Sequence, residues 1–243
     1  YSKNLDKINK YEFKKTSQNN EDGIINYLFK RLEFKNLNFI EIGFDYYENN
    51  SLNFLRKTNK GIFIDGSQEK TFLLKNLLKI FYPFKNIKVI NTMINKDNIN
   101  KIISDNFEKN EEIDFMSIDV DGIDYYIFEN LSYSPKIICI EFNFWYGSEL
   151  KCSVPYSDNF KWEQGSLYSG ASLLALTGLA EKKNYHLIAI DSSCVNAFFV
   201  RNDLKNNFEI LNPKTSFKVP NKYNSDEIEK AKRKVLSENL IYF

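Results

Sequence analysis

The sequence predicts an α/β fold with a mostly parallel seven-stranded sheet that ends in an antiparallel hairpin. Short apolar runs alternate with segments of helical periodicity along the chain. These runs are continuous rather than alternating, which is typical of parallel strands buried on both faces. Only the short turn 191–194 separates the last two runs, and this spacing favours a hairpin. We therefore expect a single domain over residues 1–243, with a core at about residues 15–205 and a C-terminal helical extension.

The individual elements follow from the same patterns. The expected strands are residues 38–43, 61–65, 86–91, 113–118, 136–141, 186–191 and 195–200. Helices are expected at residues 22–32, 71–79 and 171–180, and Ser67 is a suitable N-cap for the second of them.

Composition excludes several classes of protein. The 33 Lys and Arg residues nearly balance the 32 Asp and Glu residues, so no basic surface for nucleic acid is expected. The basic run 230–234 is interpreted as a solvated helix face. The three cysteines have no metal-type spacing, and no secretory segment or long apolar span is present. We therefore expect a reduced, cytoplasmic protein without a membrane span.

The ends of the first two strands favour a nucleoside site. In doubly wound sheets, ligands bind at the carboxyl ends of the strands. Gly43 follows the first strand and allows close approach of the backbone to a ligand, but the glycine pattern of NAD and FAD sites is absent. Asp65 ends the second strand, where a carboxylate can accept both ribose hydroxyls. The alternatives are an ordinary turn at Gly43 and a helix cap at Asp65.

Acidic residues follow the fourth and fifth strands. Asp119, Asp121 and Asp124 lie in the SIDVDGID stretch, and Glu141 and Asn143 end the next strand. Because adjacent strands lie about 4.8 Å apart, these groups should converge. Asp119, Glu141 and Asn143 are candidate ligands for Mg²⁺ or Mn²⁺, while Asp119 and Asp121 are candidate catalytic bases. The metal and the base remain alternatives, and Asp124 is expected to cap the following helix.

A long aromatic segment after the fifth strand is expected to form a lid or substrate wall, or else a loop that only covers the core edge. The rings that we expect to stack on sugar or base rings are Trp145, Tyr146, Tyr156, Trp162 and Tyr168. The single histidine, His186, opens a late strand and is interpreted as a packed residue rather than a base.

Taken in order, seven motifs resemble the FkbM-like S-adenosylmethionine-dependent methyltransferases, and more closely the bacterial sugar O-methyltransferases of capsule and surface-polysaccharide gene clusters. The resemblance covers roughly residues 15–205, and the set is more specific than any single motif. The matching segments are residues 17–23 (SQNNEDG), 39–43 (FIEIG), 61–67 (GIFIDGS), 115–125 (FMSIDVDGIDY), 140–143 (IEFN), 170–173 (GASL) and 195–201 (VNAFFVR).

The resemblance implies a Rossmann-like class I methyltransferase fold that binds S-adenosylmethionine. Gly43 would lie near the methionine moiety, Asp65 on the ribose, and Asp119 near the sulfonium, with Gln18 reaching over the cofactor. Residues 44–47 (FDYY) depart from the small residues common in this loop. The expected cofactor-binding residues are Gln18, Glu41, Gly43, Asp65, Gly66, Ser67, Thr92 and Asp119.

The implied reaction is O-methylation of a sugar hydroxyl, on a nucleotide-activated sugar such as a GDP-heptose. Asp119, Asp121 or a bound metal would handle the proton. Two alternatives remain: an N-methyltransferase acting on a sugar amide or amine, and a non-catalytic protein that binds S-adenosylmethionine or a nucleotide sugar.

Overall fold

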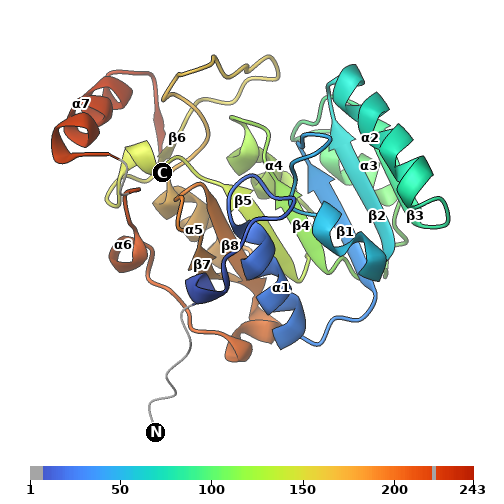
Figure 1. The fold of residues 1–243 in the computed structure, drawn as a ribbon. Helices are drawn as coiled ribbons and strands as arrows, with labels where there is room; N and C mark the ends of the chain where they lie inside the picture. Colours follow the sequence, from blue (N-terminus) through green and yellow to red (C-terminus); the bar gives the residue numbers. More distant parts are fainter. Residues whose placement is uncertain (1–7, 221–222) are drawn as a thin grey trace, which may run out of the picture.

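The structure, a computed structural model, describes residues 8–220 and 223–243. Its centre is a seven-stranded sheet with the strand order β3-β2-β1-β4-β5-β8-β7 (Figure 1). Strands β1 to β5 pair in parallel, and β8 pairs antiparallel with both β5 and β7. The strands are β1 Leu37–Ile42, β2 Thr58–Asp65, β3 Asn86–Asn91, β4 Phe115–Ile118, β5 Ile137–Glu141, β7 Tyr185–Ile190 and β8 Asn196–Arg201.

This arrangement confirms the predicted fold class, a Rossmann-like class I methyltransferase fold with a mostly parallel sheet and a terminal antiparallel hairpin. All seven predicted strands are present, and each lies close to its expected boundaries. The pattern of apolar residues was sufficient to locate these strands, because buried parallel strands are continuously apolar. In β4, for example, all four residues are buried.

Helices cover both faces of the sheet. Apolar residues of α1, α2 and the 3-10 helix η2 pack with side chains of one sheet face. Residues of α3, α4 and α5 pack with those of the other face. The helices are η1 Ile8–Tyr11, α1 Glu21–Arg31, η2 Leu52–Lys57, α2 Gln68–Phe81, α3 Ile99–Ser104, α4 Asp124–Asn130, η3 Phe144–Tyr146, α5 Leu173–Lys182, η4 Asn202–Asn207, α6 Pro213–Ser216 and α7 Ser225–Leu236.

Edge-to-face aromatic contacts consolidate the first of these layers. The Phe54 ring meets those of Phe29, Phe39 and Phe115 at centroid distances of 4.9, 5.5 and 5.6 Å. Because these rings come from α1, β1, β4 and η2, the contacts hold the loop after β1 against the sheet. That loop carries one wall of the pocket described below.

The C-terminal segment contains the expected helix and, beyond it, a short strand. Helix α7 is present, and its basic run 230–234 is largely solvent-exposed. Beyond α7 the chain forms β9 (Ile241–Tyr242), which pairs antiparallel with β6 (Cys152–Ser153). The ring of Phe243 then stacks on Tyr125 of α4 at 4.4 Å. A pairing of two residues across such a long separation leaves no local pattern in the sequence.

The predictions on membrane spans and on the cysteines can also be compared with the structure. Among them, no helix is long and apolar enough to cross a lipid bilayer. The three cysteines are buried and unpaired, and Cys139 lies in β5 as a core residue.

Candidate functional site

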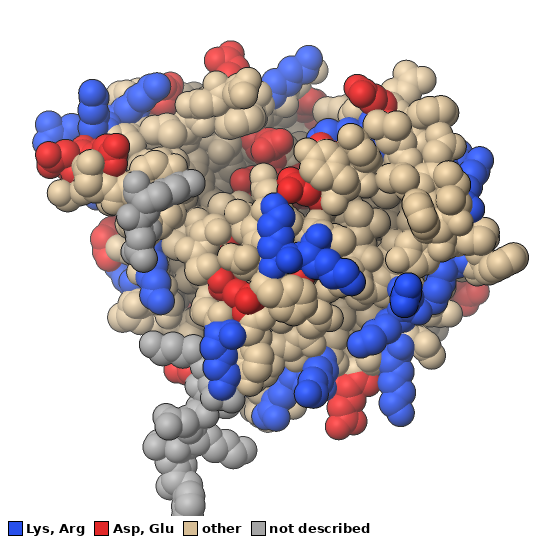
Figure 2. All heavy atoms as spheres, viewed as in Figure 1, with Lys and Arg blue, Asp and Glu red and all other residues tan. Residues whose placement is uncertain are grey.

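A pocket of about 440 Å³ opens at the carboxyl ends of β1, β2, β4 and β5. Strand β1 lies between β2 and β4, so the connections that follow β1 and β4 leave the sheet in opposite directions, and such switch points form crevices. Nine of the residues that line the pocket are Asp or Glu, and one, Lys70, is a cation. Figure 2 shows acidic side chains around the hollow in the upper middle of this face. The pocket therefore favours a cationic or hydroxyl-rich ligand over an anion.

Strand register aligns four residues across the floor of this pocket. Glu141 of β5 is paired with Asn196 of β8. One residue beyond the paired Ile42, Ile118 and Ile140 lie Gly43, Asp119 and Glu141. Backbone hydrogen bonds continue the pattern, with the Asp119 N–H donating to the Ile42 carbonyl at 2.9 Å. Gly43, Asp119, Glu141 and Asn196, which belong to the ends of four different strands, thus lie in one row across the sheet.

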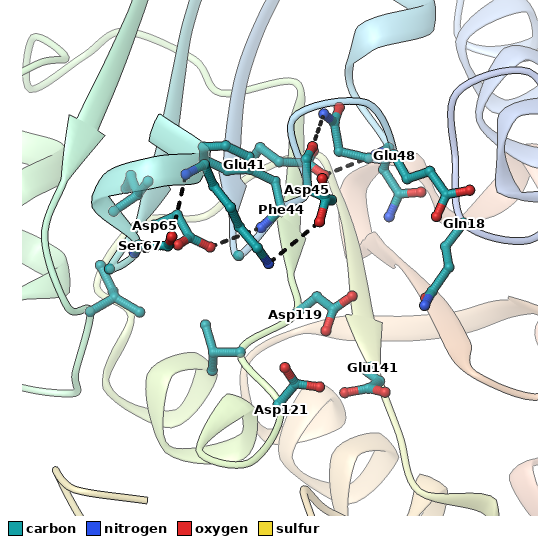
Figure 3. Close-up of a pocket in the computed structure, with 18 of the residues that line it drawn as sticks. Gln18, Glu41, Phe44, Asp45, Glu48, Asp65, Ser67, Asp119, Asp121 and Glu141 are labelled. Atoms are coloured by element: carbon teal, nitrogen blue, oxygen red, sulfur yellow. Dashed lines mark hydrogen bonds and ion pairs between the residues drawn. The ribbon is translucent and has the colours of Figure 1, made fainter. Parts of the chain in front are cut away.

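Asp119, Asp121 and Glu141 converge as the sequence predicted. One carboxylate oxygen from each lies within 4.8 Å of the others, and Figure 3 shows the three side chains pointing toward one another. Burial raises the pKa of Asp119 well above its usual value, and the neighbouring Asp121 and Asp124 raise it further. Burial and the nearby Asp119 also raise the pKa of Glu141 well above its usual value. Because like charges this close repel, the cluster favours a retained proton or a bound cation.

Asp121 is held at the pocket by the fold of its own loop. Its φ of +58° lies in the left-handed region, which a non-glycine residue rarely adopts. Asp124 stabilises this turn, since its carboxylate accepts hydrogen bonds from the N–H groups of Val120 and Gly122 at 2.9 and 3.0 Å. The prediction that the Asp124 side chain caps the helix is therefore wrong. Asp124 is the first residue of α4, and its side chain binds the loop before the helix.

The structure does not bring Asn143 to the carboxylate cluster. Its Oδ1 accepts from the Trp145 N–H at 3.0 Å, which caps η3. Its Nδ2 donates to the carbonyls of Leu167 and Ser169 at 2.7 and 3.0 Å. Asn143 therefore ties the aromatic loop together and is not among the residues that line the pocket; its role as a metal ligand stays a prediction. The chain turns away from the pocket after Glu141, and this turn removes the amide oxygen that the sequence seemed to supply.

Asn196 lines the pocket, and the sequence reasoning missed it. Its Nδ2 donates to the Glu21 carboxylate at 2.8 Å, so its Oδ1 is turned the other way. That oxygen is buried and has no hydrogen-bond partner within the described chain. The signal in the sequence was Asn196 itself, a single amide residue at the start of the otherwise apolar strand β8. Its position at the pocket could not be predicted, because it depends on the pairing with Glu141, which is distant in the sequence.

Asp65 lies at the end of β2, facing the loop after β1. Its Oδ2 accepts from the Phe44 N–H at 3.3 Å, and its Oδ1 accepts from the Ser67 N–H at 2.6 Å. Ser67 in turn caps α2 through the Lys70 N–H, and Gly66 lies between these residues at the pocket wall. Each carboxylate oxygen retains a second acceptor position, so Asp65 can still accept ligand hydroxyls.

Phe44 is the first residue of the unusual loop 44–47. It is buried and lines the pocket, and its ring packs edge-to-face on Phe63 at 5.4 Å. Gly43 is required by space as well as conformation. Its φ is +71°, and a Cβ there would lie 1.6 Å from the Asp119 carbonyl oxygen. The ends of β1 and β4 can approach this closely only with glycine.

Gln18 reaches the pocket rim because the preceding turn is tightly bonded. The Asp22 carboxylate accepts hydrogen bonds from the N–H groups of Lys15, Thr16 and Ser17, all at 2.7 to 2.8 Å. Lys14 Nζ joins this turn to the loop after β1, donating to the Gln18 carbonyl and to Glu48, both at 2.8 Å. Figure 3 shows Gln18 directed at the pocket from the side opposite Asp65.

Two predicted cofactor contacts have other partners. The Glu41 carboxylate lines the pocket, but it accepts hydrogen bonds from the Asn50 N–H at 2.9 Å and from the Ser51 hydroxyl. Burial raises its pKa from 4.5 to about 8 despite these bonds. Thr92 donates its N–H to the Asp65 carbonyl at 3.0 Å and does not line the pocket. The next two residues, Met93 and Ile94, line it instead.

The five aromatic rings expected to stack on a substrate do not line the pocket. Tyr146, for example, is fully buried against the C-terminal segment. The same loop contributes Asp158 and Phe160 in their place, and the Phe160 ring lies so close to Gly122 that a Cβ there would meet it at 2.2 Å. The loop is thus partly a pocket wall and partly a cover of the core.

His186 lies at the other end of the sheet. It is in the row of Val200 and Ile137, at the amino end of β5, and its Nε2 contacts Asn202 Oδ1 at 2.8 Å. It takes no part in the pocket, which agrees with its interpretation as a packed residue.

No protein-family model matches the chain, and no curated protein matches its sequence. Solved structures similar to it include an S-adenosylmethionine-dependent methyltransferase from Clostridium acetobutylicum (12% identity, 73% of this chain and 89% of that chain, TM-score 0.46). Magnesium protoporphyrin IX methyltransferase from Synechocystis, with bound S-adenosylmethionine, has 9% identity over 74% and 77% of the two chains and a TM-score of 0.45. The N-terminal domain of EvdMO1, with bound S-adenosylhomocysteine, has 10% identity over 72% and 76%, with a TM-score of 0.48. These TM-scores lie below 0.5, so the assignment of the fold rests on the strand order of this chain.

Replacing Gly43 with Ala should lower the free energy of unfolding by more than about 3 kcal/mol, because left-handed strain adds to a steric overlap. Urea unfolding measures this. Gly165→Ala is the matched control, since Gly165 has a φ of +81° with open space around its Cβ position. It should cost only about 1 kcal/mol. Equal losses in the two variants would contradict the close contact between β1 and β4.

Glu41 should make the protein less stable as the pH rises. Its pKa is about 8 in the folded chain against 4.5 as a free group, so folding takes up a proton between these values. The stabilisation is complete below pH 4.5 and is lost up to pH 8, at no more than about 1.4 kcal/mol per pH unit. Glu41→Gln has no proton to lose, so its unfolding free energy should fall less steeply between pH 5.5 and 7.5. Parallel pH profiles would refute the assignment.

Proposed function

We propose that this protein is an S-adenosylmethionine-dependent methyltransferase. The observation that carries the proposal is an acidic pocket at the switch point of the sheet, with Asp65 on one side of Gly43 and the Asp119, Asp121 and Glu141 cluster on the other. Its volume of about 440 Å³ suits a nucleoside-sized ligand. S-adenosylmethionine carries a carboxylate as well as a sulfonium and an ammonium, so its net charge is positive, whereas NAD and FAD would place a diphosphate against the acidic lining. The acidic lining therefore favours S-adenosylmethionine.

The cofactor orientation follows from these residues. Asp65 would accept the ribose hydroxyls, and Met93 and Ile94 would provide an apolar wall for the adenine on the β3 side. Gly43 and Gln18 would hold the methionine part. Asp119 and Glu141, both partly buried, would offset the positive charge of the sulfonium.

The acceptor is proposed to be a sugar hydroxyl. The carboxylates of Asp119, Asp121 and Glu141 offer acceptors, so they suit a group that brings O–H donors. Asp121 is the most exposed of the three carboxylates and would take the proton of the acceptor hydroxyl. The bound cofactor would supply the methyl group, and its sulfur–methyl bond would break to leave S-adenosylhomocysteine. The ordered sequence motifs, rather than the charge of the pocket, support a nucleotide-activated sugar, such as a GDP-heptose, in the synthesis of a capsular or surface polysaccharide. Only its sugar hydroxyl would enter the acidic cluster, because the carboxylates would repel the diphosphate.

A divalent cation fits the same cluster. Asp119, Asp121 and Glu141 would hold Mg²⁺ or Mn²⁺ as hard oxygen ligands, and the ion would lower the pKa of a bound hydroxyl. The pKa values of Asp119 and Glu141 are raised because their charged forms are poorly stabilised, and a bound cation would stabilise those charged forms. This ligand set replaces the one with Asn143 that the sequence indicated.

Asp65→Ala should weaken S-adenosylmethionine binding about 10- to 100-fold, because hydrogen bonds from the ribose to a charged group are lost. Isothermal titration calorimetry measures the affinity, with NAD⁺ as the ligand expected not to bind. Asp97→Ala, an exposed aspartate outside the pocket, is the control and should bind like the wild type. If the wild type bound NAD⁺ in preference to S-adenosylmethionine, the proposed function would fail.

Asp121→Asn should lower turnover at least about 100-fold while leaving the affinity for S-adenosylmethionine unchanged, since the variant removes the proton acceptor. Release of S-adenosylhomocysteine with a panel of GDP- and UDP-sugars measures turnover, and amine-bearing sugars in the same panel reveal N-methylation. EDTA should abolish activity, and Mg²⁺ or Mn²⁺ should restore it. Full activity in EDTA would leave the carboxylates as base and orienting groups without a metal.

A further inference from the structure

Helix α2 carries a second apolar side that no part of the described chain covers. Its inner side packs into the core through Leu74 and Leu78. On its outer side and just beyond its end, Phe72, Ile80, Phe81 and Phe84 are 64%, 70%, 68% and 99% exposed. We call these four residues the α2 apolar face. Folded monomers seldom expose large apolar side chains so close together, so this face indicates a binding partner.

The position of α2 leaves the face accessible. The helix lies at one edge of the sheet, beside the edge strand β3, at the right of the molecule in Figure 1. Phe72 and Ile80 are exposed on α2, Phe81 is its last residue, and Phe84 follows in the turn after the helix, so the exposed groups extend from the helix into that turn. Together they can contact a flat surface.

Charges around the face are predominantly positive. Lys75 and Lys79 are exposed on the same helix, and the only acidic residue of α2 is Glu69 in its first turn. The whole chain has a net charge of only +1, so this is a local excess. In a symmetric dimer through this face, two-fold symmetry would bring these lysines near their own copies. A second copy of the chain is therefore disfavoured.

A groove of about 540 Å³ adjoins the α2 apolar face. Leu77 and Phe81 form one side, and Tyr47 lies among the residues opposite. Lys15 and Arg56 are its two cations, and it has no acidic lining residue. Apolar walls with two cations match the chemistry of a lipid acyl chain with an anionic headgroup.

We propose that the α2 apolar face and its groove bind the surface of a membrane that contains anionic lipids. The phenylalanine and isoleucine side chains enter the interfacial layer, and the lysines and Arg56 contact the headgroups. The contact is monotopic and agrees with the absence of a spanning helix among the described residues. Ser67 and Lys70, at the start of α2, line the acidic pocket, so the bound protein holds that pocket close to the lipid surface.

Co-sedimentation with sucrose-loaded vesicles tests the proposal. The wild type should sediment with vesicles of phosphatidylcholine containing about one third phosphatidylglycerol and remain in solution with phosphatidylcholine alone. The double variant Ile80→Ser/Phe84→Ser should bind at least about tenfold less, because it removes the most exposed apolar groups. The charge variant Lys75→Glu/Lys79→Glu should lose binding to the same vesicles, and 0.5 M NaCl should weaken wild-type binding.

Ile210→Ser is the matched control, since Ile210 is 44% exposed but lies outside this face. It should sediment like the wild type, and thermal unfolding should show that all variants remain folded. The proposal is overturned if the wild type ignores anionic vesicles, or if Ile210→Ser loses as much binding as the double variant. It is also overturned if light scattering shows a dimer that Ile80→Ser/Phe84→Ser dissociates. None of these results depends on cofactor binding or turnover.

Discussion

Repulsion among three crowded carboxylates at the ends of β4 and β5 is the constraint on which the site depends. Asp119, Asp121 and Glu141 lie within 4.8 Å of one another and cannot all remain charged without compensation. The surrounding structure nevertheless enforces the cluster. The register of β4 and β5 aligns two of the carboxylates, and the hydrogen bonds of Asp124 hold the loop that presents the third. A fold that maintains such crowding is matched to a ligand that carries positive charge or donates protons.

Other residues give the pocket around this carboxylate cluster its shape. Gly43 lets β1 meet the Asp119 carbonyl, and this contact draws the loop after β1 toward Asp65. Asp22 folds the segment before α1 so that Gln18 closes the rim, and Glu21 orients Asn196 with its oxygen free. Each of these residues acts on the backbone or on another side chain. They set the shape of the pocket, while the cluster sets its charge.

Sequence reasoning placed residues correctly where they stand at the end of a strand. Asp65, Asp119 and Glu141 end apolar runs, and in a parallel sheet such residues must meet at one edge. It failed where the outcome depended on which strand lies beside which. Asn143 seemed to be the amide oxygen because it follows Glu141, yet the chain turns there and Asn143 caps η3. Asn196, far along the chain, occupies the row because β8 inserts between β5 and β7. The aromatic loop misled for the same reason, since its large rings found partners within the loop and the C-terminal segment.

The amino-acid sequence by itself determined the number and order of the main strands, the parallel character of the sheet, and the carboxylates at its ends. These properties are local, because they follow from continuous apolar runs and from the residue that ends each run. Only the tertiary structure decided which oxygens share a cavity, which aspartate holds a loop rather than a ligand, and which apolar side of α2 stays uncovered. Those outcomes depend on strand register and on contacts between distant segments, and neither leaves a trace in a short stretch of sequence.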